Sequence, residues 1–234
     1  VGIDLRPPAG VRVIDASGCV VYPGFVNTHH HLYQTLTRNI PAVQNAKLFD
    51  WLLGLYEIWR ELDTEAIEVS TRVGIGELLL SGCTTTTDHF YVFPRGAPQE
   101  FLDVEIETAL GMGARFHPTR GSMSRGRSQG GLPPDDVVQD PDTILKDCDR
   151  LIRKYHDPKP HAMCRIALAP CSPFSVTTEL LRDTIRFARE RGVREVERVA
   201  ARENEELRRR DVSSVSCAPR RERFGKRVAQ LRLV

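Results

Sequence analysis

Short apolar runs alternate with helical patterns along most of this chain, and that alternation limits the folds it can adopt. Strand-like runs are expected at residues 25–27, 84–90, 115–119 and 164–169. Helices are expected at residues 48–62, 64–80, 99–110, 140–155 and 177–191. Strands that alternate with helices are typical of a parallel α/β sheet. A closed barrel of this type needs eight such units and about 250 residues, so we expect a partial TIM-type (β/α)8 barrel with about the first four units.

Composition narrows the class of protein. The six cysteines are scattered without a C-x-x-C pair, which favours reduced thiols in a cytoplasmic protein. No apolar run reaches the roughly 18–20 residues of a membrane span, so we expect no membrane partner. The chain starts at Val1 without a secretory pattern, and we expect that the true beginning of the gene product is missing.

Three consecutive histidines follow the first predicted strand. In an extended segment, residues two apart point to the same side, so His29 and His31 can aim two imidazoles at one point while His30 faces away. Two neutral imidazoles form half of a site for zinc or a similar ion. The alternative is an exposed histidine run or a remnant of a purification tag, which the position between a strand and a helix disfavours.

The sequence around these histidines resembles a known family. Residues 15–32 (Asp-Ala-Ser-Gly-Cys-Val-Val-Tyr-Pro-Gly-Phe-Val-Asn-Thr-His-His-His-Leu) are similar to the first barrel strand of the metal-dependent amidohydrolase superfamily. Residues 81–89 (Ser-Gly-Cys-Thr-Thr-Thr-Thr-Asp-His) and 169–174 (Ala-Pro-Cys-Ser-Pro-Phe) resemble its second and fourth strands. The resemblance covers about residues 11–193, and it implies that His29 and His31 bind one divalent metal ion, zinc or alternatively iron.

Residues 31–38, 87–91, 119–124 and 170–173 resemble the 8-oxoguanine deaminase branch. This resemblance implies hydrolytic deamination of a flat, nitrogen-rich heterocycle, 8-oxoguanine to urate and ammonia. Such a ring needs a polar clamp, and we expect Gln34, His89, Arg120 and Cys171 to supply it from the ends of predicted strands. Each has a structural alternative: Arg120 can pair with a carboxylate, His89 can be a wall residue, and Gln34 can cap a turn. We expect Trp51 and Trp59 to pack rather than to stack on a substrate.

The resemblance also implies machinery that this chain lacks. In the family, a Glu in an H-x-H-x-x-E segment on the fifth strand and an Asp ending the eighth move protons. After Arg194 no such segment follows, and the last histidine is His161. We therefore expect the catalytic residues to be absent and the chain to be inactive alone.

The predicted boundaries follow from these patterns. Residues 1–19 are expected to be a remnant of an N-terminal β-rich segment, residues 20–194 the first half of the barrel, and residues 195–234 an atypical charged tail, helical or disordered. Residues 1–193 hold 21 Lys and Arg against 24 Asp and Glu, whereas residues 194–234 hold 12 against 7. The body therefore shows no basic bias that would indicate a nucleic-acid partner.

Residues 195–219 are interpreted as foreign to the barrel, through a local reading-frame error or a spliced fragment end, because residues 222–227 resemble the family again. An authentic surface helix is the alternative. Three functions stay open: the purine-type deaminase acting on a small heterocycle, a hydrolase of triazine-like heterocycles, and a non-catalytic fragment whose tail binds a partner. A homo-oligomer is compatible with each.

Overall fold

The computed structural model describes residues 8–98 and 100–195 of the chain. Five strands are present: β1 (Phe25–Asn27), β2 (Cys83–Phe90), β3 (Arg115–Ser122), β4 (Ala167–Pro170) and β5 (Arg194–Glu195). Five α-helices accompany them: α1 (Leu48–Trp59), α2 (Thr64–Leu80), α3 (Phe101–Gly111), α4 (Pro141–Tyr155) and α5 (Thr178–Arg191). Two short 3₁₀ helices, η1 (Leu32–Thr37) and η2 (Arg127–Gln129), lie in the loops.

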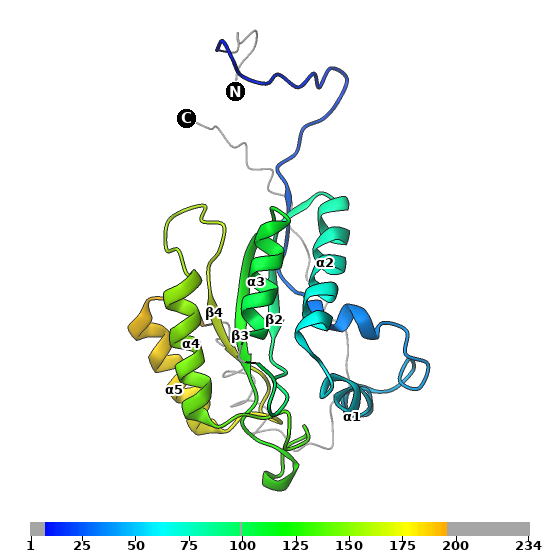
Figure 1. The fold of residues 1–234 in the computed structure, drawn as a ribbon, viewed down its shortest axis with the longest axis vertical. Helices are drawn as coiled ribbons and strands as arrows, with labels where there is room; N and C mark the ends of the chain where they lie inside the picture. The colour runs from blue at the N-terminus through cyan, green and yellow to red at the C-terminus, as the bar shows by residue number, and fades with distance from the viewer. Residues whose placement is uncertain (1–7, 99, 196–234) are drawn as a thin grey trace, which may run out of the picture. The chain divides into compact units, whose positions relative to one another are not determined.

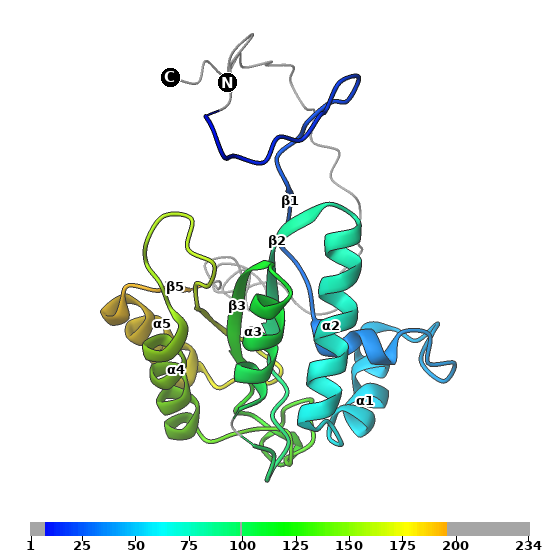
Figure 2. The same ribbon diagram turned by 45° about the horizontal axis from the view of Figure 1, so that its top comes forward.

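The strands form one parallel sheet in sequence order, β1-β2-β3-β4-β5. The helices after the strands line one face of this sheet (Figures 1 and 2). This confirms the predicted partial (β/α)8 barrel, including all four expected strands. The two-residue β5 pairs with β4 through Ala167 and Arg194, so a fifth strand begins where the sequence indicated none.

The core lies between the sheet and its helices. Phe116 of β3, Ile106 of α3, Leu151 of α4 and Leu180 of α5 are all 0–1% exposed. Burial of such side chains contributes about 1.5–3 kcal/mol each relative to exposure. The helix layer therefore fixes the strand ends that carry the predicted site residues.

Side-chain caps determine where the helices begin. The Asp63 carboxylate accepts a hydrogen bond from the Ala66 amide at 2.8 Å, and Asp140 accepts one from Thr143 at 2.9 Å. Both caps satisfy a backbone donor that the first turn leaves free. Gly192 ends α5 with φ +66°, a conformation that favours glycine. These boundaries match the sequence prediction.

The predicted chain ends are only partly described. Residues 8–24 contain no helix or strand, and the β-rich origin of residues 1–19 stays a prediction. The charged tail, from residue 196 onward, lies outside the described residues, as does most of the segment 195–219. Among the residues that the structure describes, no helix is long and apolar enough to cross a membrane.

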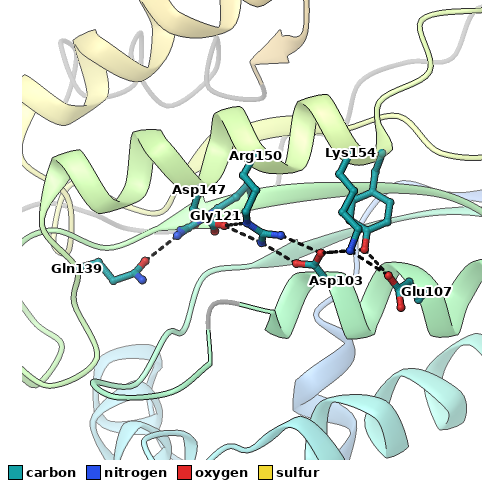
Figure 3. A network of polar contacts seen from close by, with 9 residues as sticks. Asp103, Glu107, Gly121, Gln139, Asp147, Arg150 and Lys154 are labelled. Atoms are coloured by element: carbon teal, nitrogen blue, oxygen red, sulfur yellow. Dashed lines mark hydrogen bonds and ion pairs between the residues drawn. The ribbon is translucent and has the colours of Figure 1, made fainter.

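A network of charged side chains joins α3 to α4 (Figure 3). The buried Asp103 accepts hydrogen bonds from Arg150 at 2.6 Å, Lys154 at 2.8 Å and the Tyr155 hydroxyl at 2.9 Å. Burial alone raises the pKa of Asp103, but these donors outweigh it and the pKa is lowered. Asp103 therefore stabilises the helix layer as a carboxylate.

We predict that Asp103→Asn lowers the free energy of unfolding by roughly 2–3 kcal/mol near neutral pH, because hydrogen bonds to a charged acceptor are lost. Since the folded pKa lies below the unfolded one, this contribution is present above about pH 4 and is lost as the pH falls. Urea unfolding at about pH 7 and about pH 3 measures both effects. The matched control is Glu107→Gln at the exposed end of the network, expected to change stability by less than about 1 kcal/mol. An equal loss at both pH values would contradict the assignment.

Candidate active site

His29 and His31 lie just beyond the carboxyl end of β1, and their rings are neighbours. The ring centroids are 5.3 Å apart and nearly perpendicular. His31 Nδ1 lies 2.8 Å from the carbonyl oxygen of His89. A carbonyl only accepts, so Nδ1 carries the proton and Nε2 keeps a free lone pair. Burial lowers the pKa of His31, which favours the neutral imidazole that a metal ion requires.

His30 has a different environment. Its Nδ1 is 3.8 Å from Asp88 Oδ1, and its ring lies near Gly74 of α2. His30 faces the helix layer, whereas His29 and His31 contact each other. His30 nevertheless lines the same open cavity as His29 and His31, so its separation from a site of the other two stays a prediction.

Gln34 and His89 lie close to the histidine pair. The Gln34 amide donates to the hydroxyls of Tyr33 at 3.2 Å and Tyr91 at 3.4 Å. The His31 ring is 5.5 Å from the His89 ring and 5.6 Å from the Tyr91 ring. The structure thus brings Gln34 and His89 together with His31, as the sequence predicted.

His89 is held in a neutral form. Its Nε2 donates to the Ala169 carbonyl oxygen at 3.0 Å. Burial, followed by the proximity of His31, lowers its pKa to about 4. A neutral His89 offers Nδ1 as an acceptor, so it can orient a ligand without adding charge.

Cys171 follows β4 and its amide donates to the Ser122 carbonyl oxygen at 2.9 Å. Burial raises the pKa values of Tyr33 and Tyr91. The Cys171 thiol is near enough to both hydroxyls to add to this rise electrostatically. Cys171 therefore belongs to the same group. No disulfide links the cysteines among the described residues, which are Cys19, Cys83, Cys148, Cys164 and Cys171.

Arg120 does not join this group, and here the sequence prediction was wrong. Its side chain is fully buried on the helix side of the sheet, where Nε donates to Asp147 of α4 at 2.8 Å. Its other nitrogens donate to the Gly121 carbonyl oxygen and the Gln139 side chain (Figure 3). The guanidinium also lies 3.9 Å above the Phe93 ring. Alternate residues of β3 face opposite sides, so Arg120 faces the helices and Gly121 the other face.

Two tyrosines were missed as site residues. Tyr33 and Tyr91 bond to Gln34, and the spacing of two between His89 and Tyr91 was the available signal for the second tyrosine. Trp59 is fully buried and Trp51 packs against the core with its ring 5.4 Å from that of Trp59, as expected. Trp51 also lines an open cavity of about 430 Å³ together with His29, His30, His31 and Gln34. This cavity is large enough for a bicyclic heterocycle.

The donor set fits half of a metal site. No group of three or more His, Cys, Asp or Glu side chains within residues 8–98 and 100–195 is arranged to hold a metal ion. His29 and His31 supply two nitrogen ligands, and the second-sphere bond of His31 to a carbonyl is typical of metal-bound histidines.

The comparison with known proteins agrees with this geometry. The profile of the amidohydrolase family matches residues 20–207. The chain belongs to the amidohydrolase family. This match runs beyond residue 193, where the resemblance read from the sequence ended.

Two amidohydrolases of known activity are similar to this chain. It is 52% identical over 180 residues to 8-oxoguanine deaminase of Pseudomonas aeruginosa (strain PAO1), covering 77% of this chain and 40% of that protein. It is 37% identical over 186 residues to hydroxydechloroatrazine ethylaminohydrolase of Pseudomonas sp. (strain ADP), covering 79% and 39%. The chain thus spans about 40% of the length of these relatives.

A solved amidohydrolase structure shares the fold. The zinc complex of atrazine chlorohydrolase from Arthrobacter aurescens TC1 superposes with a TM-score of 0.69 at 33% identity. The match covers 79% of this chain and 43% of that one. That structure supports a divalent metal in this family.

Gly121 leaves the space that His89 needs. A Cβ atom there would lie 2.5 Å from the Phe90 carbonyl oxygen and 2.8 Å from His89 Nε2. We predict that Gly121→Ala lowers the free energy of unfolding by about 1–3 kcal/mol through overpacking and displaces His89. Urea unfolding gives the first effect, and the NMR resonances of His89 give the second.

The matched control is Gly111→Ala at the end of α3, where a Cβ atom meets nothing within 4 Å. It is expected to leave stability unchanged or to raise it by up to about 1 kcal/mol. A Gly121→Ala variant as stable as the Gly111→Ala variant would contradict the close-packing argument.

Proposed function

We propose that this chain carries the amino-terminal half of the active site of a metal-dependent deaminase of purine-like heterocycles, with 8-oxoguanine as substrate. The observation that carries the proposal is the grouping of His29 and His31 with Gln34, His89 and Tyr91 at the strand ends. The 52% identity to an 8-oxoguanine deaminase supports the substrate class. Zinc is the proposed ion, in line with the zinc-bound family structure.

The chain's own residues would divide the work. His29 and His31 would hold the ion through imidazole nitrogens, and the bound ion would supply Lewis-acid activation of water. Gln34 offers both a donor and an acceptor to a ring edge, and His89 Nδ1 offers an acceptor. Cys171 and Tyr91 would bound the ring, and Trp51 lines the open cavity beside His29, His31 and Gln34. The proton-transferring Glu and Asp of the family stay unassigned, and we propose that the chain alone is inactive.

A hydrolase of triazine-like heterocycles is the second candidate. The 37% identity to a hydroxydechloroatrazine ethylaminohydrolase supports it. Both candidates need the same metal half-site and differ in the ring that Gln34 and its neighbours recognise. In both proposals the substrate is a small soluble heterocycle rather than a nucleic acid or a membrane.

Zinc titration tests the metal half-site. We predict that the chain binds Zn²⁺ weakly, and that His29→Ala or His31→Ala raises the dissociation constant by about tenfold or more, because one of two nitrogen ligands is lost. Competition with a chromogenic chelator measures it. The controls are His30→Gln and the exposed His161→Asn, both expected to stay within about twofold of the unmodified chain. Equal loss in all four variants would contradict the assignment.

A chimaera tests the substrate class. Replacing the matched 180-residue part of the Pseudomonas aeruginosa 8-oxoguanine deaminase with that of this chain is expected to retain ammonia release from 8-oxoguanine. We expect that rate to exceed the rate on hydroxylated aminotriazines by about tenfold or more, because unmatched polar groups are penalised in a hydrogen-bonding site. The His31→Ala chimaera is the control and should be inactive.

The outcomes separate the alternatives. A preference for aminotriazines would favour the second candidate, and a folded chimaera without activity would favour a non-catalytic role. The purified 234-residue chain should release ammonia at the background rate. Robust release by the chain alone would overturn the proposed inactivity.

A further inference from the structure

Two carboxyl groups are buried together behind the histidine segment. Asp88 of β2 and Glu105 of α3 are both 0% exposed, and their carboxyl groups are in hydrogen-bonding contact. As two carboxylates they have no donor to share: Asp88 Oδ2 and both Glu105 oxygens then lack a hydrogen-bond partner. A single proton between them turns this repulsive contact into a hydrogen bond.

The charges nearby do not remove the need for this proton. Among the described residues, the one basic group within ion-pair range of Asp88 is His30, with Nδ1 at 3.8 Å, too far for a hydrogen bond. Arg38 is near enough to His30 to act on it electrostatically. Arg38 itself pairs with Glu77 at 2.8 Å on α2. The buried hydroxyls of Ser70 and Thr71 on α2 donate to the Ile67 carbonyl oxygen instead.

Asp88 also holds the segment that carries the histidines. The Leu32 amide donates to Asp88 Oδ1 at 2.5 Å. Two further bonds tie the same segment to β2: His89 N to the His30 carbonyl oxygen at 2.9 Å, and His31 Nδ1 to the His89 carbonyl oxygen at 2.8 Å. Of these three bonds, only the one from Leu32 uses a side chain of β2.

We propose that Asp88 and Glu105 form a positioning pair that shares one proton, in which the Glu105 carboxylic acid donates to Asp88 Oδ2. Asp88 then keeps a negative charge, and Oδ1 accepts the Leu32 amide in a charge-assisted bond. Such bonds are about twice as strong as neutral ones. The pair thereby fixes the backbone at Leu32, directly after His31. Its importance for metal geometry rests on the proposed function, whereas the shared proton and the Leu32 bond do not.

Two near-isosteric variants of Glu105 test the pair. Gln in Glu105→Gln still donates an N–H to Asp88, whereas Met in Glu105→Met has a similar shape and no donor. Without that donor, Asp88 must take up the proton itself or admit water, and its bond to Leu32 weakens. The measured quantity is hydrogen–deuterium exchange of the Leu32 amide in the full chain, divided by that of the Phe116 amide. Phe116 of β3 donates to the Met163 carbonyl oxygen at 2.8 Å, a bond that involves neither member of the pair, so the ratio removes any global loss of stability.

The ratio is expected to stay within about twofold of the unmodified chain in Glu105→Gln and to rise about tenfold in Glu105→Met, since a charged acceptor is worth about 1–1.5 kcal/mol more than a neutral one. Equal ratios in the two variants would overturn the proposal.

Infrared spectroscopy decides the case if Glu105→Met does not fold. The unmodified chain at about pH 8 should show the carbonyl band of a protonated carboxyl group, and Glu105→Gln should lack it. Absence of that band in the unmodified chain would overturn the shared proton.

Zinc titration of the same variants separates this proposal from the proposed function. Loss of a second-sphere partner weakens metal binding by about 10–100-fold, and Glu105→Met should show a loss of this order relative to Glu105→Gln. If the unmodified chain binds no Zn²⁺, the metal half-site fails, while the exchange ratio still decides the pair.

Discussion

Side chains of strand β2 alternate between two environments, and the candidate site depends on this alternation. Asp88 and Phe90 face the helices and are fully buried, whereas Thr87 and His89 face the other side of the sheet. The parallel register of β2 with β3, in which His89 lies opposite Thr119, extends the same division to the next strand. A shift by one residue would exchange the buried acid for the imidazole. The hydrogen bonds from β2 to residues 30–32 then transmit this register to His31.

Much of the fold follows from the sequence because local signals and the global arrangement agree. The caps at Asp63 and Asp140 and the stop at Gly192 are local, and each helix begins or ends there. Serial strand–helix units leave a parallel sheet as the simplest arrangement. Strand β5 could not be predicted, because a two-residue strand is defined by its partner β4 rather than by its own composition.

Site residues could be predicted from the sequence where their spacing along an extended segment alone decides which way their side chains point. His29 and His31 follow from period two, and so does Tyr91, which lies two residues after His89. Tyr33 lies in the 3₁₀ helix η1, where that period does not hold. The prediction for Arg120 was wrong. Its position at a strand end suggested that it faces the site, but the alternation of side chains along β3 places it beside Asp147 in the helix layer. The carboxyl pair of Asp88 and Glu105 joins two elements far apart in sequence, and no local pattern signals that contact.

The central claim is that two histidines after β1 form a metal half-site. X-ray absorption spectroscopy of the Zn²⁺-loaded chain tests it most directly. Two imidazole ligands at about 2.0–2.1 Å are expected, with solvent completing the shell. The spectrum should be unchanged in His30→Gln and should lose one imidazole in His31→Ala. A shell that includes His30, or one without imidazole nitrogen, would contradict the account.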